Sequence, residues 1–74
     1  MPHVIVKLYP GRSEEQKRRL AEAIAKDVQE IVICPVGVIS VAIEEVPEAE
    51  WQEKVYRPDI LAKPQMLYKK PEET

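Results

Sequence analysis

The sequence has very few of the residues that small proteins use for covalent or metal cross-links. Its 74 residues include one cysteine, Cys34, and one histidine, His3. One cysteine excludes an internal disulfide, and this pair cannot supply the three or four protein ligands of a zinc site. A chain of this size buries a limited share of its surface and usually needs some such support. The size therefore predicts self-association.

Long apolar runs and a dominant charge of one sign are also missing. The longest apolar run, residues 31–34, is far shorter than the roughly 20 residues of a membrane-spanning helix. The N-terminus lacks a basic region followed by an apolar stretch, so we expect no signal peptide and a cytoplasmic protein. Eleven Lys and Arg residues against thirteen Asp and Glu residues give a net charge of −2. Because nucleic-acid binding depends on phosphate neutralisation, this charge balance predicts no nucleic-acid partner. The short apolar runs predict no membrane partner.

Glycine is scarce, and several kinds of catalytic motif are missing with it. The two glycines, Gly11 and Gly37, are too few for a phosphate-binding loop or a glycine-rich dinucleotide fingerprint. The chain also has no Ser-His-Asp set. No residue cluster suggests a metal or an organic cofactor, so we expect the protein to need none.

What is present is a pattern of strand, helix and strand. Residues 3–9 alternate in polarity and end at a Pro-Gly pair, which predicts a strand. Ser13 and Gln16 form a capping box, and apolar residues then recur at helical spacing over residues 13–33. Residues 38–46 alternate again and predict a second strand. This order predicts an α/β (α+β) fold, a βαβ unit of two parallel strands with the helix on one face.

The helix can cover only one face of such a sheet. The opposite face would still carry Ile5 and Tyr9. Two strands alone do not form a stable sheet in water. We therefore expect a second copy of the chain to cover this face and to extend the sheet.

The chain is predicted to be a single domain, residues 1–74. Residues 2–46 form the βαβ core, residues 47–70 form a C-terminal segment that packs on the core or on a neighbour, and residues 71–74 form a frayed end. Pro47 suits the first position of a short helix, and a further single turn is expected around Pro58.

Pro2 is the residue that most suggests chemistry. An initiator methionine that precedes proline is normally removed, so we expect the mature chain to begin with the secondary amine of Pro2. An α-amino group titrates at about pH 7.7–8.0, and burial or a nearby cation lowers that value. The free amine would then be a general base close to neutral pH. The alternative is that Pro2 merely begins a strand.

Pro2, the alternating strand and the segment G-R-S-E-E-Q-K at residues 11–17 together resemble the 4-oxalocrotonate tautomerase family. The family has a nearly identical segment at the same distance from its amino-terminal proline, and the likeness covers residues 2–51. The tail, residues 51–71, is similar to that of short bacterial tautomerase-like proteins, one of which acts on phenylpyruvate-type enols and is dimeric. The resemblance implies an isomerase that catalyses enol–keto tautomerisation of a 2-oxo acid.

The resemblance also implies roles for single residues. Pro2 matches the family's catalytic general base. Arg12 matches the arginine that binds the substrate carboxylate, a role that suits the planar guanidinium, although Arg12 could instead be a solvated cation. Trp51 falls where the family has an aromatic residue that lines the pocket, and ordinary tail packing is its alternative role.

One residue departs from the family pattern. The family's second arginine falls at Ser40, whose hydroxyl can donate one hydrogen bond but carries no charge. This departure favours a mono-acid with an apolar or aromatic end over a dicarboxylate. His3, Lys7 and Arg57 are the residues that could replace the lost charge, and the sequence leaves open which of them reaches the site.

Two other functions stay open at this point. Relatives with the same amino-terminal proline hydrate or dehalogenate haloacrylic acids, although the serine in place of an arginine counts against that chemistry. A non-catalytic interaction domain with the same oligomeric fold is the other alternative. The expected partners are a small 2-oxo acid or its enol and a second copy of the chain in a homodimer, with a hexamer as the alternative assembly.

Overall fold

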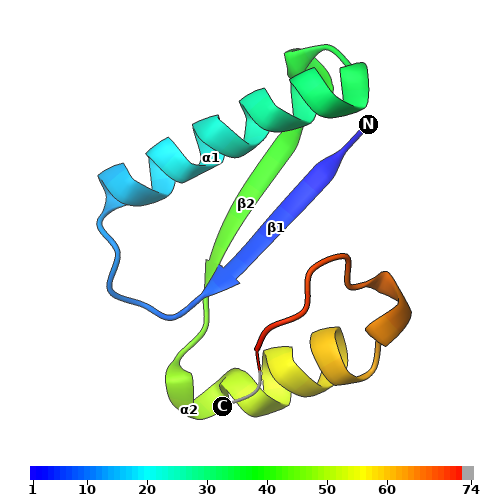
Figure 1. The fold of residues 1–74 in the computed structure, drawn as a ribbon. Coiled ribbons are helices and arrows are strands. Elements are labelled where there is room, and N and C mark those ends of the chain that lie inside the picture. The colour runs from blue at the N-terminus through cyan, green and yellow to red at the C-terminus, as the bar shows by residue number, and fades with distance from the viewer. Residues whose placement is uncertain (73–74) are drawn as a thin grey trace.

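The computed structural model describes residues 1–72, and its centre is a parallel pair of strands with a long helix on one side (Figure 1). Strand β1, His3–Leu8, pairs in parallel with strand β2, Ser40–Glu45. His3 lies opposite Ser40 at one end of the ladder, and Leu8 lies opposite Glu45 at the other end. Helix α1, Glu14–Val28, connects the two strands and completes the predicted βαβ fold.

Helix α1 begins as its sequence predicts. The Ser13 hydroxyl accepts a hydrogen bond from the Gln16 N–H at 3.1 Å, and the Gln16 side chain accepts one from the Ser13 N–H at 2.9 Å. This reciprocal pair satisfies two of the N–H groups that a helix start leaves unpaired. The helix is not uniform up to Ile33, because the α-helix ends at Val28 and residues Gln29–Ile33 form a wider π-helical turn. This turn ends at Ile33, whose φ of 63° stops the helix.

The second strand is shorter than its alternating pattern predicts. Residues Val36–Val38 form one 3₁₀ turn instead of extended chain. The Val38 N–H donates to the Pro35 carbonyl at 3.2 Å, so the backbone at Val38 is used by the turn. The ladder with β1 therefore starts at Ser40, two residues later than expected.

The two faces of the sheet differ in how well they are covered. Helix α1 packs on β2, and Lys17 on the helix lies 3.6 Å from Glu45 on the strand. On the face that α1 covers, Val4, Val6 and Leu8 are half-buried. On the opposite face, Ile5 is 53% exposed. The chain by itself therefore leaves the part of this face around Ile5 open to solvent.

The C-terminal segment forms a longer helix than predicted. Helix α2, Glu48–Trp51, follows Pro47 as its N-cap and runs directly into a π-helical stretch, η3, Gln52–Leu61. The expectation of a separate turn around Pro58 is wrong, because Pro58 lies inside this helix. A proline removes one backbone donor and crowds the preceding turn of an α-helix, and the wider π-helical turn relieves that crowding.

The C-terminal segment lies on the side of the strands away from α1 (Figure 1). A short 3₁₀ turn, η4, Pro64–Met66, follows the helix. Within the described residues, the side chains less than one-tenth exposed are Val46, after β2, and Val55, in η3. Residues 73–74, half of the predicted frayed end 71–74, lie outside the described residues. None of the helices over residues 1–72 combines the length and the apolar character that crossing a bilayer requires.

Candidate active site

The first group of predicted site residues lies where both strands begin. Pro2 precedes β1, is half-buried, and its carbonyl accepts a hydrogen bond from the Ser40 N–H at 3.2 Å. This contact belongs to the parallel ladder in which His3 and Ser40 are register partners. We call this group, Pro2, His3 and Ser40, the Pro2 end.

The side chains of His3 and Ser40 are in direct contact at the Pro2 end. Nδ1 of His3 lies 2.6 Å from Oγ of Ser40, within hydrogen-bond distance. Both residues are exposed, and as register partners they project from the same face of the sheet. The sequence singled out Ser40 but left His3 as one of three candidates, because strand register is not visible in a local pattern. The structure brings His3 to Ser40.

The second group of predicted site residues lies where the strands end. Gly11 has a φ of 129°, a backbone conformation that residues other than glycine rarely adopt. It directs the chain from β1 toward the start of α1. Arg12 follows in this turn and is exposed, and within residues 1–72 it has no ion-pair partner. Its guanidinium is therefore available for a carboxylate, which it can hold through two parallel N–H donors.

Trp51 also lies near the ends of the strands. Its ring meets the ring of Tyr9 edge to face, with centroids 4.9 Å apart and an angle of 83° between the planes. Tyr9 directly follows β1, and Trp51 ends α2, which starts soon after β2. We call Tyr9, Arg12 and Trp51 the Arg12 end. Its two aromatic rings provide an apolar surface, and Tyr9 precedes Arg12 by three residues in the chain.

The two ends are too far apart within one chain to bind the same small substrate. Seven residues of extended chain separate Pro2 from Tyr9, which is about 23 Å at roughly 3.3 Å per residue. Figure 1 shows the same separation, with the N-terminus at one end of β1 and the turn to α1 at the other. One chain therefore brings Ser40 to Pro2 but does not bring Arg12 or Trp51 to them.

Lys7, a second candidate for the missing charge, has another partner. Its ammonium lies 2.6 Å from Asp59 on η3 and 3.9 Å from Glu44 on β2. The hydrogen bond to Asp59 and the attraction of the two carboxylates raise the pKa of Lys7. This contact ties the C-terminal segment to the open face of the sheet. Arg57, the third candidate, lies on the exposed surface of η3 and is not part of the Pro2 end.

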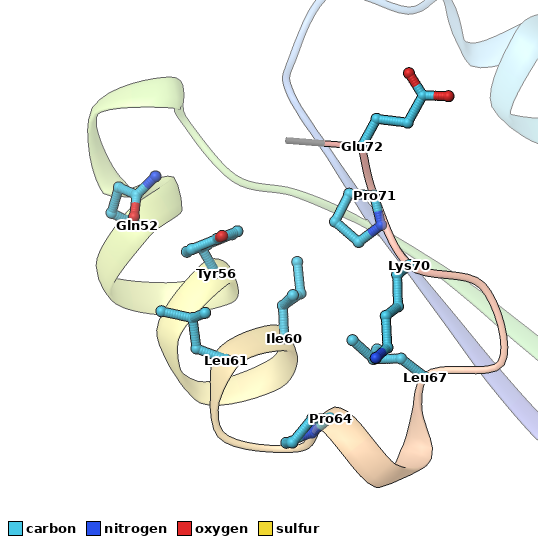
Figure 2. A pocket seen from close by; sticks show the side chains of 9 residues that line it. All are labelled: Gln52, Tyr56, Ile60, Leu61, Pro64, Leu67, Lys70, Pro71 and Glu72. Carbon is cyan, nitrogen blue, oxygen red and sulfur yellow. The ribbon is translucent and has the colours of Figure 1, made fainter. Parts of the chain in front are cut away.

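A cavity of about 520 Å³ lies elsewhere, between η3 and the last described residues (Figure 2). None of the four predicted site residues lines it. Figure 2 shows side chains of η3 on one side of the cavity and Leu67, Lys70 and Pro71 on the other. Within residues 1–72, no group of three or more His, Cys, Asp or Glu side chains is arranged to hold a metal ion. The predicted site residues therefore do not share an enclosed cavity in one chain.

Comparison with known proteins gives this arrangement a context. The family model described as Tautomerase enzyme matches residues 2–56. A protein named "Probable tautomerase" from Xylella fastidiosa is 39% identical over 71 residues, which cover 96% of this chain and 87% of that protein.

Two solved structures show the same fold. TomN, a 4-oxalocrotonate tautomerase homologue in the tomaymycin biosynthetic pathway, is 34% identical with a TM-score of 0.65, over 68% of this chain and 77% of that chain. A heterohexamer 4-oxalocrotonate tautomerase from Chloroflexus aurantiacus is 31% identical with a TM-score of 0.66, over 69% of this chain and 82% of that chain. These findings confirm the resemblance and the fold predicted from the sequence. The chain belongs to the 4-oxalocrotonate tautomerase family of the tautomerase superfamily and is an isomerase of the tautomerase type.

Proposed function

We propose that the protein catalyses the enol–keto tautomerisation of a 2-oxo acid, with Pro2 as the general base after removal of Met1. The neutral amine of Pro2 takes the proton from the enol hydroxyl and returns a proton to the neighbouring carbon. One O–H bond breaks and one C–H bond forms, so the reaction is a balanced isomerisation. Arg12 holds the carboxylate of the substrate.

The placement of Pro2 is the observation that carries this proposal. Pro2 is half-buried at the start of β1, and the Ser40 N–H fixes its carbonyl. Met1 is 100% exposed, so its removal costs no packing and leaves its peptide bond accessible to an aminopeptidase. Burial of an amine favours its neutral form, which is the form that accepts a proton.

A complete site requires a second copy of the chain. Pro2 and Arg12 flank opposite ends of β1 in one chain, and the stretch from Pro2 to Tyr9 alone spans about 23 Å at roughly 3.3 Å per residue. Two copies related by a two-fold axis with their strands antiparallel place the Pro2 end of one beside the Arg12 end of the other. The open sheet face with Ile5 supports such an assembly, and the related protein from Chloroflexus aurantiacus is a heterohexamer. We propose a homodimer in which each site combines Pro2 of one chain with Arg12 and Trp51 of its partner.

The side chains of the two ends favour a mono-acid with an apolar or aromatic end. Arg12 is one guanidinium and suits one carboxylate, whereas Ser40 offers a hydroxyl without charge. The edge-to-face pair of Tyr9 and Trp51 offers aromatic surface for the rest of the substrate. A phenylpyruvate-type enol combines these features.

Ketonisation of phenylenolpyruvate, followed by ultraviolet absorbance, tests the proposal. The protein would first be shown by mass spectrometry to have lost Met1, and Pro2→Ala would be assayed beside it. Because a general base contributes about 10²–10⁴-fold to a rate, we expect the variant to lose about 100-fold or more in kcat. Equal rates for the two folded proteins, or no rate above buffer for the natural chain, would refute the proposal.

A further inference from the structure

The contact between His3 and Ser40 bears on how the Ser40 hydroxyl is oriented. Both are the first residues of their strands, both are exposed, and Nδ1 of His3 lies 2.6 Å from Oγ of Ser40. Ser40 is also joined to Pro2 through the backbone, at 3.2 Å. The backbone of Ser40 is therefore directly beside that of Pro2, at the spacing of about 4.8 Å between neighbouring strands.

The direction of this hydrogen bond determines what Ser40 can offer a ligand. A serine hydroxyl has one proton to donate, and a histidine ring nitrogen either donates or accepts. If Nδ1 carries no proton, Ser40 donates to the ring and has no proton left for another acceptor. If Nδ1 carries a proton, the ring donates to Oγ, and the Ser40 O–H is free to donate elsewhere.

The reaction proposed above creates a need for such a donor. When Pro2 takes the proton of the enol hydroxyl, negative charge develops on the oxygen at that carbon. A donor already aimed at this position stabilises the developing charge more strongly than it stabilises the starting enol. The Ser40 hydroxyl is a side-chain donor at the Pro2 end, on the residue whose backbone N–H donates to the Pro2 carbonyl.

We propose that His3 is a positioning residue that donates from Nδ1 to the Ser40 hydroxyl and so directs the Ser40 O–H toward the enolate oxygen of the substrate. This inference rests on the proposed function. Ser40 transfers no proton in the step, because the proton moves from the enol oxygen to Pro2 and then to carbon. Lys7 was a candidate to replace the arginine missing at Ser40, but its ammonium is paired with Asp59. The pair of His3 and Ser40 would supply a polar group at the Pro2 end instead.

Four variants test the pair in the phenylenolpyruvate assay. We expect Ser40→Ala to lower kcat about 10- to 100-fold with little change in KM, because the donor acts mainly on the transition state. We expect His3→Ala to lower kcat in the same way. His3→Asn and His3→Gln form a matched pair, since an asparagine amide reaches the position of Nδ1 and a glutamine amide reaches that of Nε2. Asparagine should restore kcat to within about 3-fold, and glutamine should behave like alanine.

The double variant His3→Ala/Ser40→Ala distinguishes joint from independent action. Two residues that act as one unit give non-additive losses, so the double variant should be no slower than Ser40→Ala alone. Additive losses, an unchanged kcat in His3→Ala, or an effect on KM alone would overturn the proposal. Pro2→Ala in the same assay keeps the two hypotheses apart. A natural chain without activity refutes both, whereas an active chain that tolerates His3→Ala and Ser40→Ala refutes only the pair.

A measurement on the natural chain avoids any dependence on folding of the variants. His3 is the single histidine, so imidazole nitrogen signals in a long-range ¹H–¹⁵N spectrum belong to it without further assignment. The probe is phenylglyoxylate, a 2-oxo acid with an aromatic end and no carbon-bound proton to transfer. We expect a protonated Nδ1 in the complex. A complex in which Nδ1 carries no proton would overturn the proposal.

Discussion

The Pro2 end and the Arg12 end belong to the same pair of strands, yet they differ in every property that matters for chemistry. The Pro2 end has a serine and a histidine in direct contact, and a backbone hydrogen bond joins Ser40 to Pro2. After the proposed removal of Met1, it would also carry the free amine of Pro2. The Arg12 end has a guanidinium that lacks an ion-pair partner among residues 1–72, in a glycine turn, and a packed pair of aromatic rings. One end is suited to proton transfer, and the other is suited to binding. Because about 23 Å of strand separates them, we propose that a working site combines the two ends from different chains.

Mixing two impaired variants would test this division with the largest expected effect. Pro2→Ala, which loses kcat, and Arg12→Ala, which has little activity at substrate concentrations far below its raised KM, would be mixed, allowed to exchange subunits and assayed at such a concentration. Half of the dimers would then be hybrids with one intact site of two, so activity should rise to roughly a quarter of the natural level. Mixing Pro2→Ala with the double variant Pro2→Ala/Arg12→Ala is the control and should restore nothing. No recovery despite subunit exchange, shown by native mass spectrometry, would place both residues of a site in one chain.

Substitution of Arg12 tests whether this residue acts in substrate binding or in the chemical step. Hydrogen bonds to a charged group are worth about 1.5–3 kcal/mol, so Arg12→Ala should raise KM about 10- to 100-fold with a much smaller change in kcat. Arg12→Lys keeps the charge but loses the two parallel donors, and we expect an intermediate KM. Steady-state kinetics on phenylenolpyruvate measures both constants. A fall in kcat at constant KM would instead assign Arg12 to the chemical step.

Trp51 tests whether the Arg12 end also stabilises the fold. Its edge-to-face contact with Tyr9 joins α2 to the end of β1. Such a pair contributes about 0.5–1.5 kcal/mol beyond the buried area, so Trp51→Ala should lower the free energy of unfolding by about 1–3 kcal/mol. Trp51→Phe keeps an aromatic edge and should lose less. Urea unfolding at one fixed protein concentration compares the three chains, and an unchanged midpoint for the alanine variant would contradict the expectation.

The contact between Lys7 and Asp59 should have the smallest effect, and it depends on pH. Asp59 raises the pKa of Lys7, so the contact contributes fully at neutral pH and is lost as the pH rises through that raised value. Melting temperatures from about pH 7 to about pH 11, above the usual lysine pKa, should therefore converge for the natural chain and Asp59→Asn. A constant difference across this range would show that Asp59 acts through packing and not through the charge of Lys7.

Local patterns in the sequence were sufficient for the order of elements and for the family. Alternation along residues 3–9 follows from the two-residue repeat of a strand, and the capping box at Ser13 is a contact between residues three apart. Pro2 and the G-R-S-E-E-Q-K segment both lie within the first 17 residues, so the resemblance could be recognised without a structure. The helix through Pro58 was missed, since the expectation of a break there assumed α-helical geometry.

By itself, the sequence determined that a proline, an arginine, a serine and a tryptophan accompany a βαβ fold of this family. Only the tertiary structure decided which of the three candidate residues lies beside Ser40, because the register of β1 on β2 joins residues 37 positions apart. The structure also decided that Pro2 and Arg12 lie at opposite ends of one strand. Each strand is extended for local reasons, but what lies beside it depends on how the whole chain, and its partner, pack together.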